Sequence, residues 1–406
     1  MNLMRKAQNT WGMCIKERYI SEWVLNIPQS GIREIFHESL KLKDVIHLEI
    51  GDPDFNTSEI IVEAIYKAML EGYTHYTHNA GLIELRKSIA EYYTRKYNTT
   101  LDPENNIVVT AGSSEGLSLS LLATLNPGDE VLIPDPGYPS YVPMIMCSRG
   151  KVVRYSVREE ENFEINPSEV LSKVTSKTKA IIINNPQNPT GSVTSIKKLE
   201  EIVEYAHSKG IVIISDEVYE NIVYDYTPFT SLSVLTSYDN VVVVNSLSKT
   251  FAMTGLRIGF VVTRNEKLVE VMTRMQEGLI ACAPAPIQVG AIKALSMFSE
   301  LVPPMVREYE KRRNVLISEL SRLKKVSFTI PRGTFYMLVN VSKHTGDSRT
   351  FARKLLLQNR VAVAPGIAFG PGGEGYIRIS FATSTDKIVE GVKRIGDFLT
   401  SGGELT

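Results

Sequence analysis

The sequence is poor in cysteine and tryptophan, and neither sign of charge is in excess. Its 406 residues include two tryptophans and three cysteines, Cys14, Cys147 and Cys282, without Cys-x-x-Cys spacing. Neither a metal site nor a disulfide framework is predicted, and a reducing compartment is favoured. Lys plus Arg equals Asp plus Glu at 45 each, so no global field would bind a nucleic acid through counterion release. Small-molecule partners are therefore expected.

Long apolar runs are also missing. No run reaches the roughly 20 residues that a membrane-spanning helix needs. Arg5, Lys6 and Lys16 interrupt the apolar residues of the amino terminus, which is not typical of a signal peptide. We therefore expect no contact with a membrane and a cytoplasmic location. The composition, 43% hydrophobic and 22% charged, is that of a globular protein, and the length predicts two or three domains.

Short apolar runs rich in β-branched residues indicate strands. They lie at residues 107–109, 131–133, 181–183, 211–214 and 241–244. Because they lack polar alternation, we expect strands that are buried on both faces. Helical spacing appears between them, at 117–125 and 196–206. This alternation predicts an α/β domain over residues 51–300, with a mostly parallel sheet flanked by helices.

The pattern changes after Pro303 and Pro304. A long charged helix is expected there, followed by strands at 335–339 and 376–381. The second of these alternates in polarity, which is typical of a half-exposed antiparallel strand. We expect residues 1–50 and 301–406 to form a smaller α+β domain built from both termini.

Charged residues follow two of the predicted strands. Asp216 comes after the run at 211–214, and Lys249 comes soon after the run at 241–244. Ligands of open α/β sheets bind beyond the carboxyl ends of the strands. A lysine at this edge would be partly desolvated, which lowers its pKa and makes the neutral, nucleophilic amine accessible. Taken alone, Lys249 would more often be a solvated residue that opens a helix.

The residues around Lys249 favour a functional lysine over a solvated one. Residues 246–259, SLSKTFAMTGLRIG, closely resemble the cofactor-attachment segment of class I and II aminotransferases, which are fold-type I pyridoxal phosphate (PLP) enzymes. Further matches follow the family's order along nearly the whole chain, at residues 51–55, 76–81, 112–115, 136–139, 185–191, 215–219 and 376–378. The resemblance implies a large domain with a seven-stranded type of sheet, and PLP bound to Lys249 as a Schiff base.

The resemblance also implies roles around the cofactor ring. Asp216 would pair with the pyridine nitrogen and keep it protonated, which makes the ring a better electron sink. Asn188 and Tyr219 would form hydrogen bonds with the phenolic oxygen and stabilise its ionised form. Tyr138 would stack on the ring. Taken alone, Asp216 would be a helix N-cap, Asn188 part of an ordinary turn and Tyr219 a half-buried aromatic residue.

The phosphate needs backbone donors and a fixed cation. The resemblance assigns five residues to it: Gly112, Ser113, Ser114, Ser246 and Arg257. Tyr76 would reach the phosphate from a neighbouring subunit, which implies a homodimer with shared active sites. In isolation, Gly-Ser-Ser before a helix is more often only a cap, and Tyr76 an ordinary core or surface tyrosine.

Arg378, central in an apolar strand, would bind the α-carboxylate of the substrate, helped by Asn188 and the backbone at Gly51. The alternative for Arg378 is a buried ion pair with an acidic residue. We expect the amino-terminal segment around Ile27, Ile32 and Ile35 to contribute to the pocket wall, and an apolar wall favours aromatic or aliphatic side chains. No basic residue can be assigned to a second substrate carboxylate, so aspartate specificity stays open.

Residues 370–375 match the GxGxxG pattern of dinucleotide sites. They lead into the predicted strand at Tyr376 rather than into a helix, so this reading is rejected.

The expected activity is amino-group transfer between an L-amino acid and a 2-oxo acid by a ping-pong mechanism. A PLP-dependent lyase or synthase would share the cofactor residues and is the first alternative. A PLP-binding regulator of DNA is disfavoured, because the chain has neither an added helix-turn-helix segment nor a basic excess.

Overall fold

The structure is a computed structural model that describes residues 19–21 and 23–401. Arg5, Lys6, Lys16 and Cys14, which entered the expectations on location and cysteine chemistry, lie outside these residues.

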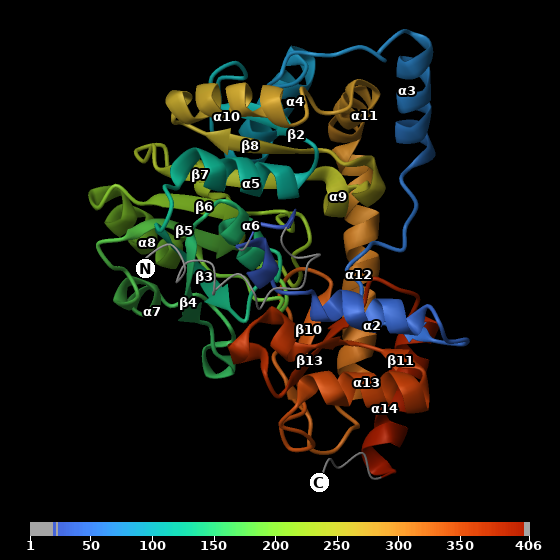
Figure 1. Cartoon of the computed structure of the whole chain (residues 1–406). Helices are drawn as coiled ribbons and strands as arrows, with labels where there is room; N and C mark the ends of the chain where they lie inside the picture. The colour runs from blue at the N-terminus through green and yellow to red at the C-terminus, as the bar shows by residue number, and fades with distance from the viewer. Residues whose placement is uncertain (1–18, 22, 402–406) are drawn as a thin grey trace.

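A seven-stranded sheet forms the centre of the large part of the molecule (Figure 1). Its order is β2-β8-β7-β6-β5-β3-β4. β8 is antiparallel to both of its neighbours, and the other four pairings are parallel. The strands are β2 (Ile107–Thr110), β3 (Glu130–Asp135), β4 (Lys151–Ser156), β5 (Thr178–Asn184), β6 (Val212–Asp216), β7 (Val241–Ser246) and β8 (Gly259–Thr263). The expectation of a mostly parallel, seven-stranded type of sheet is confirmed.

Alternate residues of each central strand enter different cores. Ile181 and Ile183 of β5 belong to one hydrophobic cluster, whereas Ala180 and Ile182 belong to another on the opposite face. Both faces are thus covered, as continuous apolar strands require. One face carries α5 (Ser113–Thr124), α6 (Tyr141–Cys147) and α10 (Glu266–Leu279); the other carries α4 (Ile83–Tyr97), α7 (Pro167–Ser172), α8 (Ile196–Ser208) and α11 (Ala285–Ser296).

β4 was not among the predicted strands. It lies at the edge of the sheet, and Lys151 and Arg154 interrupt its apolar residues. An edge strand needs no continuous apolar run, because only part of its surface is buried. The local pattern therefore gave no strand signal there.

A second, four-stranded antiparallel sheet has the order β12-β13-β10-β9. Its strands are β9 (Ser327–Phe328), β10 (Tyr336–Asn340), β12 (Ala364–Pro365) and β13 (Tyr376–Ser380). Helices α13 (Ser348–Asn359) and α14 (Thr385–Thr400) pack with it around a separate core (Figure 1). The amino-terminal segment joins this part: β1 (Ile46–His47) pairs with β11 (Val361–Ala362), and α2 (Gly31–Ser39) contacts α13.

The expectation that β13 is half exposed is wrong. Four of its five residues are buried. Ile377 and Ile379 belong to the core of this second part, while Arg378 on the opposite face contacts Asn188 of the large part. The polar alternation therefore reflects a face that lies against another part of the protein rather than against water.

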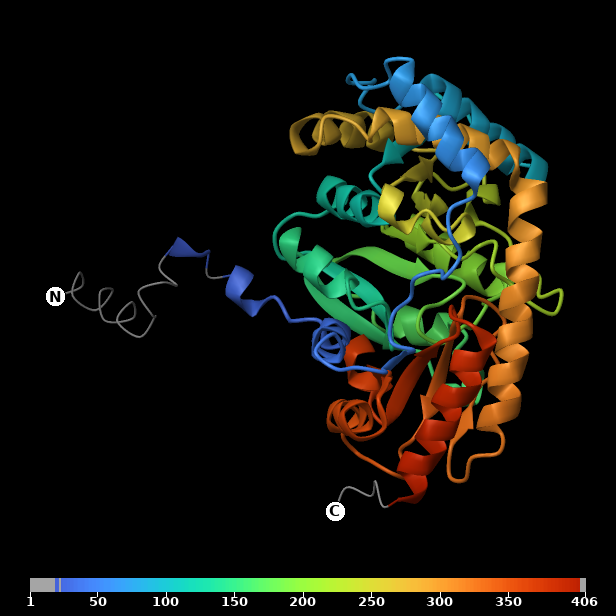
Figure 2. The same ribbon diagram turned by 90° about the vertical axis from the view of Figure 1, so that its right-hand side faces the viewer.

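The long helix α12 (Phe298–Leu320) connects the two parts (Figure 2). Pro303 and Pro304 lie inside this helix, not before it as expected. The predicted domain boundary between residues 300 and 301 also falls inside α12. Within the described residues, no single helix is long and apolar enough to cross a membrane. Of these helices, α11 and α12 meet the length and apolarity required only when they are taken together, and a bend of 79° separates them.

The remaining elements are short, apart from α3 (Glu59–Leu70), which packs against α11. They are α9 (Leu247–Thr250) and the 3-10 helices η2 (Val24–Asn26), η3 (Glu159–Glu161), η4 (Leu232–Val234), η5 (Thr254–Leu256), η6 (Gly366–Phe369) and η7 (Pro371–Gly373). The GxGxxG segment thus passes through η7 into β13, so it does lead into a strand.

Candidate active site

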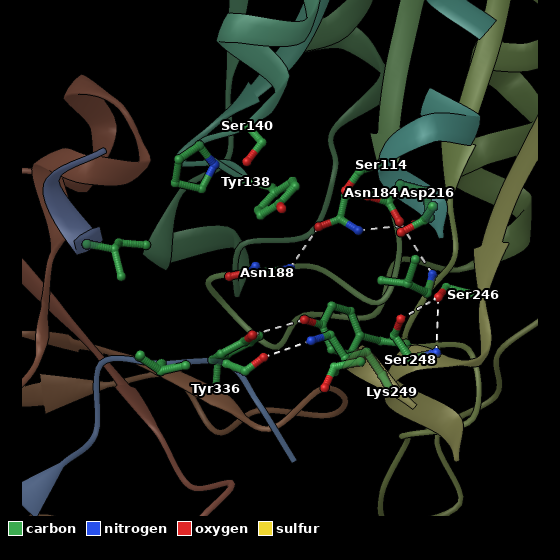
Figure 3. A pocket seen from close by; sticks show the side chains of 18 of the residues that line it. Ser114, Tyr138, Ser140, Asn184, Asn188, Asp216, Ser246, Ser248, Lys249 and Tyr336 are labelled. Carbon is green, nitrogen blue, oxygen red and sulfur yellow. Dashed lines mark hydrogen bonds between the residues drawn. The ribbon is translucent and has the colours of Figure 1, made fainter. Parts of the chain in front are cut away.

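A cavity of about 310 Å³ lies between the carboxyl edge of the large sheet and the second sheet. Eleven of the predicted site residues line it: Gly51, Ser113, Ser114, Tyr138, Asn188, Asp216, Tyr219, Ser246, Lys249, Arg257 and Arg378. In Figure 3, Tyr138 and Tyr336 lie on one side of the open centre, and Asp216, Ser246 and Lys249 lie on the other. Segments that are far apart in the sequence therefore meet at one place.

Lys249 lies on α9, the short helix that follows β7. The Ser246 side chain caps this helix by accepting a hydrogen bond from the Ser248 amide at 3.0 Å. Lys249 Nζ donates to the carbonyl oxygen of Gly51 at 2.7 Å. Burial lowers the pKa of Lys249 to about 8, and nearby Arg378 and Arg257 act in the same direction, against the opposing effect of Asp52. A useful fraction of the amine is therefore neutral near pH 7.

Asp216 ends β6 and is buried beneath the cavity. Tyr141 donates a hydrogen bond to its Oδ2 at 2.7 Å, and none of the described cationic side chains forms an ion pair with it. Burial raises the pKa of Asp216 to about 6, although the Tyr141 bond opposes this shift. A buried carboxylate without a counterion suits a ligand that brings a positive N–H group.

Asn188 follows β5 in a loop that Asn184 holds in place. Asn184 Oδ1 accepts a hydrogen bond from the Asn188 amide at 2.8 Å, and its Nδ2 donates to the Asp216 carbonyl at 3.1 Å. Tyr219 lies after β6, and its hydroxyl is 3.0 Å from the hydroxyl of Tyr336. Two hydrogen-bonding side chains thus flank the space above Asp216.

An anion site is formed where α5 begins. Gly112 has a φ of +85°, and a Cβ at this position would lie 2.5 Å from Nη2 of Arg257. Glycine therefore lets the guanidinium approach the free amides of the helix start. Within the described residues, Arg257 donates to the carbonyl oxygens of Thr254 and Ala111, at 2.9 and 3.4 Å. With no acidic partner among the described residues, this cation is suited to a phosphate.

Arg378 is 3% exposed and is held by neutral groups. It donates to Asn188 Oδ1 at 3.1 Å and to the Glu49 carbonyl, and its guanidinium lies 4.1 and 4.8 Å from the ring centres of Tyr336 and Phe369. Its buried Nε has no hydrogen-bond partner in the part of the chain that the structure describes. Burial lowers its pKa. None of the described acids forms an ion pair with Arg378, so the alternative of a buried ion pair is not supported.

Some expected residues do not reach this cavity. Tyr76 is 87% exposed and does not line it. The amino-terminal segment around Ile27, Ile32 and Ile35 does contribute to the cavity wall, through Ile32 and its neighbours, but Ile27 and Ile35 themselves do not line it. Ile35 is buried in the core of the second part, because α2 turns this side chain toward α13; Ile27 precedes the helix.

Several lining residues were not predicted: Arg33, Phe36, Ser140, Asn184, Ser248, Thr254 and Tyr336. Tyr336 stands in an apolar run that is typical of a core strand, so its pattern gave no functional signal. Arg33 belongs to a charged helix, where most arginines are solvated. Only the packing of α2 and β10 against the large part brings them to the site. Within the described ranges, there is no group of three or more His, Cys, Asp or Glu side chains that could hold a metal ion.

Comparisons with known proteins identify the family of this chain. The family model "Aminotransferase class I and II" matches residues 43–395. An aspartate aminotransferase of Pyrococcus horikoshii is 40% identical over 94% of this chain and 97% of the relative. An aromatic-amino-acid aminotransferase of Thermococcus litoralis is 38% identical over 93% and 97%. The structure of an aspartate aminotransferase from Thermus thermophilus with maleate superposes with a TM-score of 0.88 at 30% identity, over 93% and 99% of the two chains.

The chain therefore belongs to the class I and II aminotransferase family, as the resemblance implied. Its α/β fold is that of the fold-type I PLP enzymes.

Proposed function

We propose that this aminotransferase binds pyridoxal 5′-phosphate and transfers an amino group between an L-amino acid and a 2-oxo acid in a ping-pong reaction. One observation carries the proposal: Lys249, Asp216, Arg257 and Arg378 line a single cavity. The last three are charged, and none of them forms an ion pair with a described residue. When bound, the cofactor supplies an aldehyde for Lys249 and an electron sink for the substrate's α-carbon.

Four residues would hold the ring. Asp216 would pair with the protonated pyridine nitrogen, an interaction of about 4 kcal/mol at 4 Å in an effective dielectric near 20. Tyr219 and Asn188 would donate to the phenolic oxygen. Tyr138, which lines the cavity, would stack on the ring face.

The phosphate would lie at the start of α5, held by the amides and hydroxyls of Ser113 and Ser114 together with Ser246 and Arg257, while Gly112 leaves room for the Arg257 guanidinium. Tyr76 would contribute from a second copy of the chain. This homodimer is supported by a group of exposed apolar and aromatic residues on α3 and the segment after it: Val62, Tyr66, Met69, Leu70, Tyr73 and Tyr76. Such a patch is typical of an interface.

Arg378 would bind the substrate's α-carboxylate through its unpartnered Nε and its terminal nitrogens, while Asn188 and the backbone at Gly51 complete the contact. This fixes the α-hydrogen of the substrate near Lys249. The free Lys249 amine would act as the general base that takes this proton from the α-carbon, and then as the general acid that delivers it to the cofactor carbon that had carried the aldehyde. Its lowered pKa keeps enough of the amine neutral for this role.

The substrate side chain would lie against α2. Ile32 and Phe36 offer an apolar wall, and Arg33 offers a guanidinium. Glu34 and Glu38 of the same helix pair with Arg349 and Arg353 of α13, whereas no described acid pairs with Arg33. We therefore propose that the site accepts both aromatic and dicarboxylic substrates. The names of the Pyrococcus and Thermococcus relatives support this choice.

The free thiols of Cys147 and Cys282 support the further proposal that the enzyme works in the cytoplasm.

Reduction of the holoenzyme with borohydride, followed by peptide mapping, tests the proposal. The cofactor label is expected on Lys249, and Lys249→Ala should bind the cofactor without being labelled and without turnover. Label on another residue contradicts the assignment. Assays with and without 2-oxoglutarate separate the alternatives, because a lyase would form product without the oxo acid.

A further inference from the structure

Tyr336 contacts three separate parts of the site, although nothing in the sequence set it apart. It is the first residue of β10, and its side chain is 2% exposed. Its neighbours are the hydroxyl of Tyr219, the guanidinium of Arg378 and the backbone of Gly51. In Figure 3 it faces the cavity from the side of the second sheet.

The contact with Tyr219 joins two phenols, whose oxygens are 3.0 Å apart. Burial raises the pKa of both hydroxyls, so each carries its proton near neutral pH. Each hydroxyl has one proton to donate. If Tyr219 donates to a ligand in the cavity, the proton between the two oxygens must come from Tyr336. Donation by Tyr336 polarises Tyr219 and strengthens its bond to the ligand.

The contact with Arg378 follows from strand pairing. Arg378 of β13 lies opposite Leu338, and Tyr336 lies opposite Ser380. Tyr336 and Arg378 are therefore diagonal neighbours on one face of the sheet, within reach of long side chains. The ring of Tyr336 stacks on one side of the guanidinium, whose second aromatic neighbour is Phe369. A buried cation without an acidic partner depends on such contacts for its orientation.

The contact with Gly51 is steric. A Cβ at Gly51 would lie 1.6 Å from the hydroxyl oxygen of Tyr336. The hydroxyl thus lies directly against the Gly51 backbone, whose carbonyl oxygen accepts the hydrogen bond from Lys249. A single side chain adjoins the groups assigned to cofactor, substrate and lysine.

We propose that Tyr336 is a positioning residue, whose hydroxyl directs the Tyr219 proton toward the cofactor and whose ring orients Arg378 for the substrate carboxylate. This inference rests on the proposed function. The two effects are separable, because one belongs to the hydroxyl and the other to the ring.

Tyr336→Phe removes the hydroxyl and keeps the ring. A donor to the phenolic oxygen favours its ionised form and eases proton loss from the imine between Lys249 and the cofactor. A weaker donor should raise the imine pKa by about 0.2–0.6 units, with the KM for amino acids within about twofold of wild type. The measurement is a pH titration of the visible absorption of the holoenzyme. Tyr155→Phe is the matched control, since it removes a buried hydroxyl that donates to the Ile182 carbonyl at 2.9 Å; no shift is expected.

Tyr336→Leu removes the ring as well. The KM for amino acids should then rise about 5- to 30-fold, as expected for the loss of a desolvated cation–π contact. An imine pKa in Tyr336→Phe equal to that of wild type refutes the role of the hydroxyl, and an unchanged KM in Tyr336→Leu refutes that of the ring. If Tyr336→Leu does not fold, Tyr336→Phe still decides the first role, and Phe369→Leu tests the orientation of Arg378 from its other aromatic neighbour. A wild-type absorption that survives Lys249→Ala would instead contradict the proposed function.

Discussion

The hydroxyl of Tyr141 lies 2.7 Å from Oδ2 of Asp216 and donates a hydrogen bond to this buried carboxylate. Burial raises the pKa of Asp216 to about 6, and the bond from Tyr141 works against that rise. Tyr141 therefore helps to keep Asp216 ionised at neutral pH, the form that a protonated ring nitrogen needs.

Tyr141→Phe should weaken cofactor binding about 10- to 100-fold, because a hydrogen bond to a charged group is worth roughly 1.5–3 kcal/mol. Affinity requires ionised Asp216, so it is present above the pKa of this residue and is lost below it. The variant has the higher pKa and should lose affinity at a higher pH than wild type. Titration of the apoenzyme with the cofactor at several pH values measures this. Equal affinities in Tyr141→Phe and Tyr155→Phe would contradict the role of Tyr141.

Lys249→Met should stabilise the apoenzyme at pH 7 by about 3 kcal/mol, the free energy that corresponds to the lowered pKa of the lysine. The folded-state pKa of Lys249 is about 8, below its ordinary value of 10.5, so folding disfavours its protonated form. That cost is complete below pH 8 and disappears as the pH rises through 8 to 10.5. The advantage of the variant should therefore shrink over this range in urea unfolding experiments. Lys354→Met, on the exposed face of α13, is the control; a destabilised Lys249→Met at pH 7 would count against a buried, desolvated amine.

Arg33→Gln should raise the KM for aspartate and 2-oxoglutarate about 5- to 50-fold, since a charge-assisted hydrogen bond to the second carboxylate is lost. The KM for an aromatic donor should stay within about twofold. Arg349→Gln, which removes a cation from the nearby ion pair with Glu34, is the matched control. Equal losses for both substrate classes would show that Arg33 acts on the helix and not on the substrate.

Met69→Glu should raise the dissociation constant of the proposed homodimer about 100-fold or more, because a charge would be buried without a partner. Met69 is half exposed on α3, and Tyr76 follows in the next segment. Loss of the dimer should also weaken cofactor binding, since Tyr76 would no longer reach the phosphate. Sedimentation velocity and cofactor titration provide the readouts. Leu357→Glu on α13 is the control, and a stable dimer of Met69→Glu would place the interface elsewhere.

The sequence by itself determined five of the seven strands of the large sheet, and the family. Runs such as 181–183 and 241–244 are apolar at every position, and only strands covered on both faces need such runs. The segment around Lys249 was specific enough to imply the fold type and the residues that now meet at one cavity. Local patterns failed where burial came from distant segments: β13 looked half exposed because Arg378 faces the large part. Pro303 and Pro304, which were expected to precede the long helix, lie inside α12.

Only the tertiary structure decided which side chains complete the site. The sequence pattern around Tyr336 predicts one more core residue of a strand, and the pattern around Arg33 predicts a solvated residue of a helix. Their placement depends on how the second sheet and α2 pack against the large sheet, and the free energy of that packing is shared among residues far apart in the chain. Sequence periodicity reports which face of an element is buried; it does not report what lies against that face.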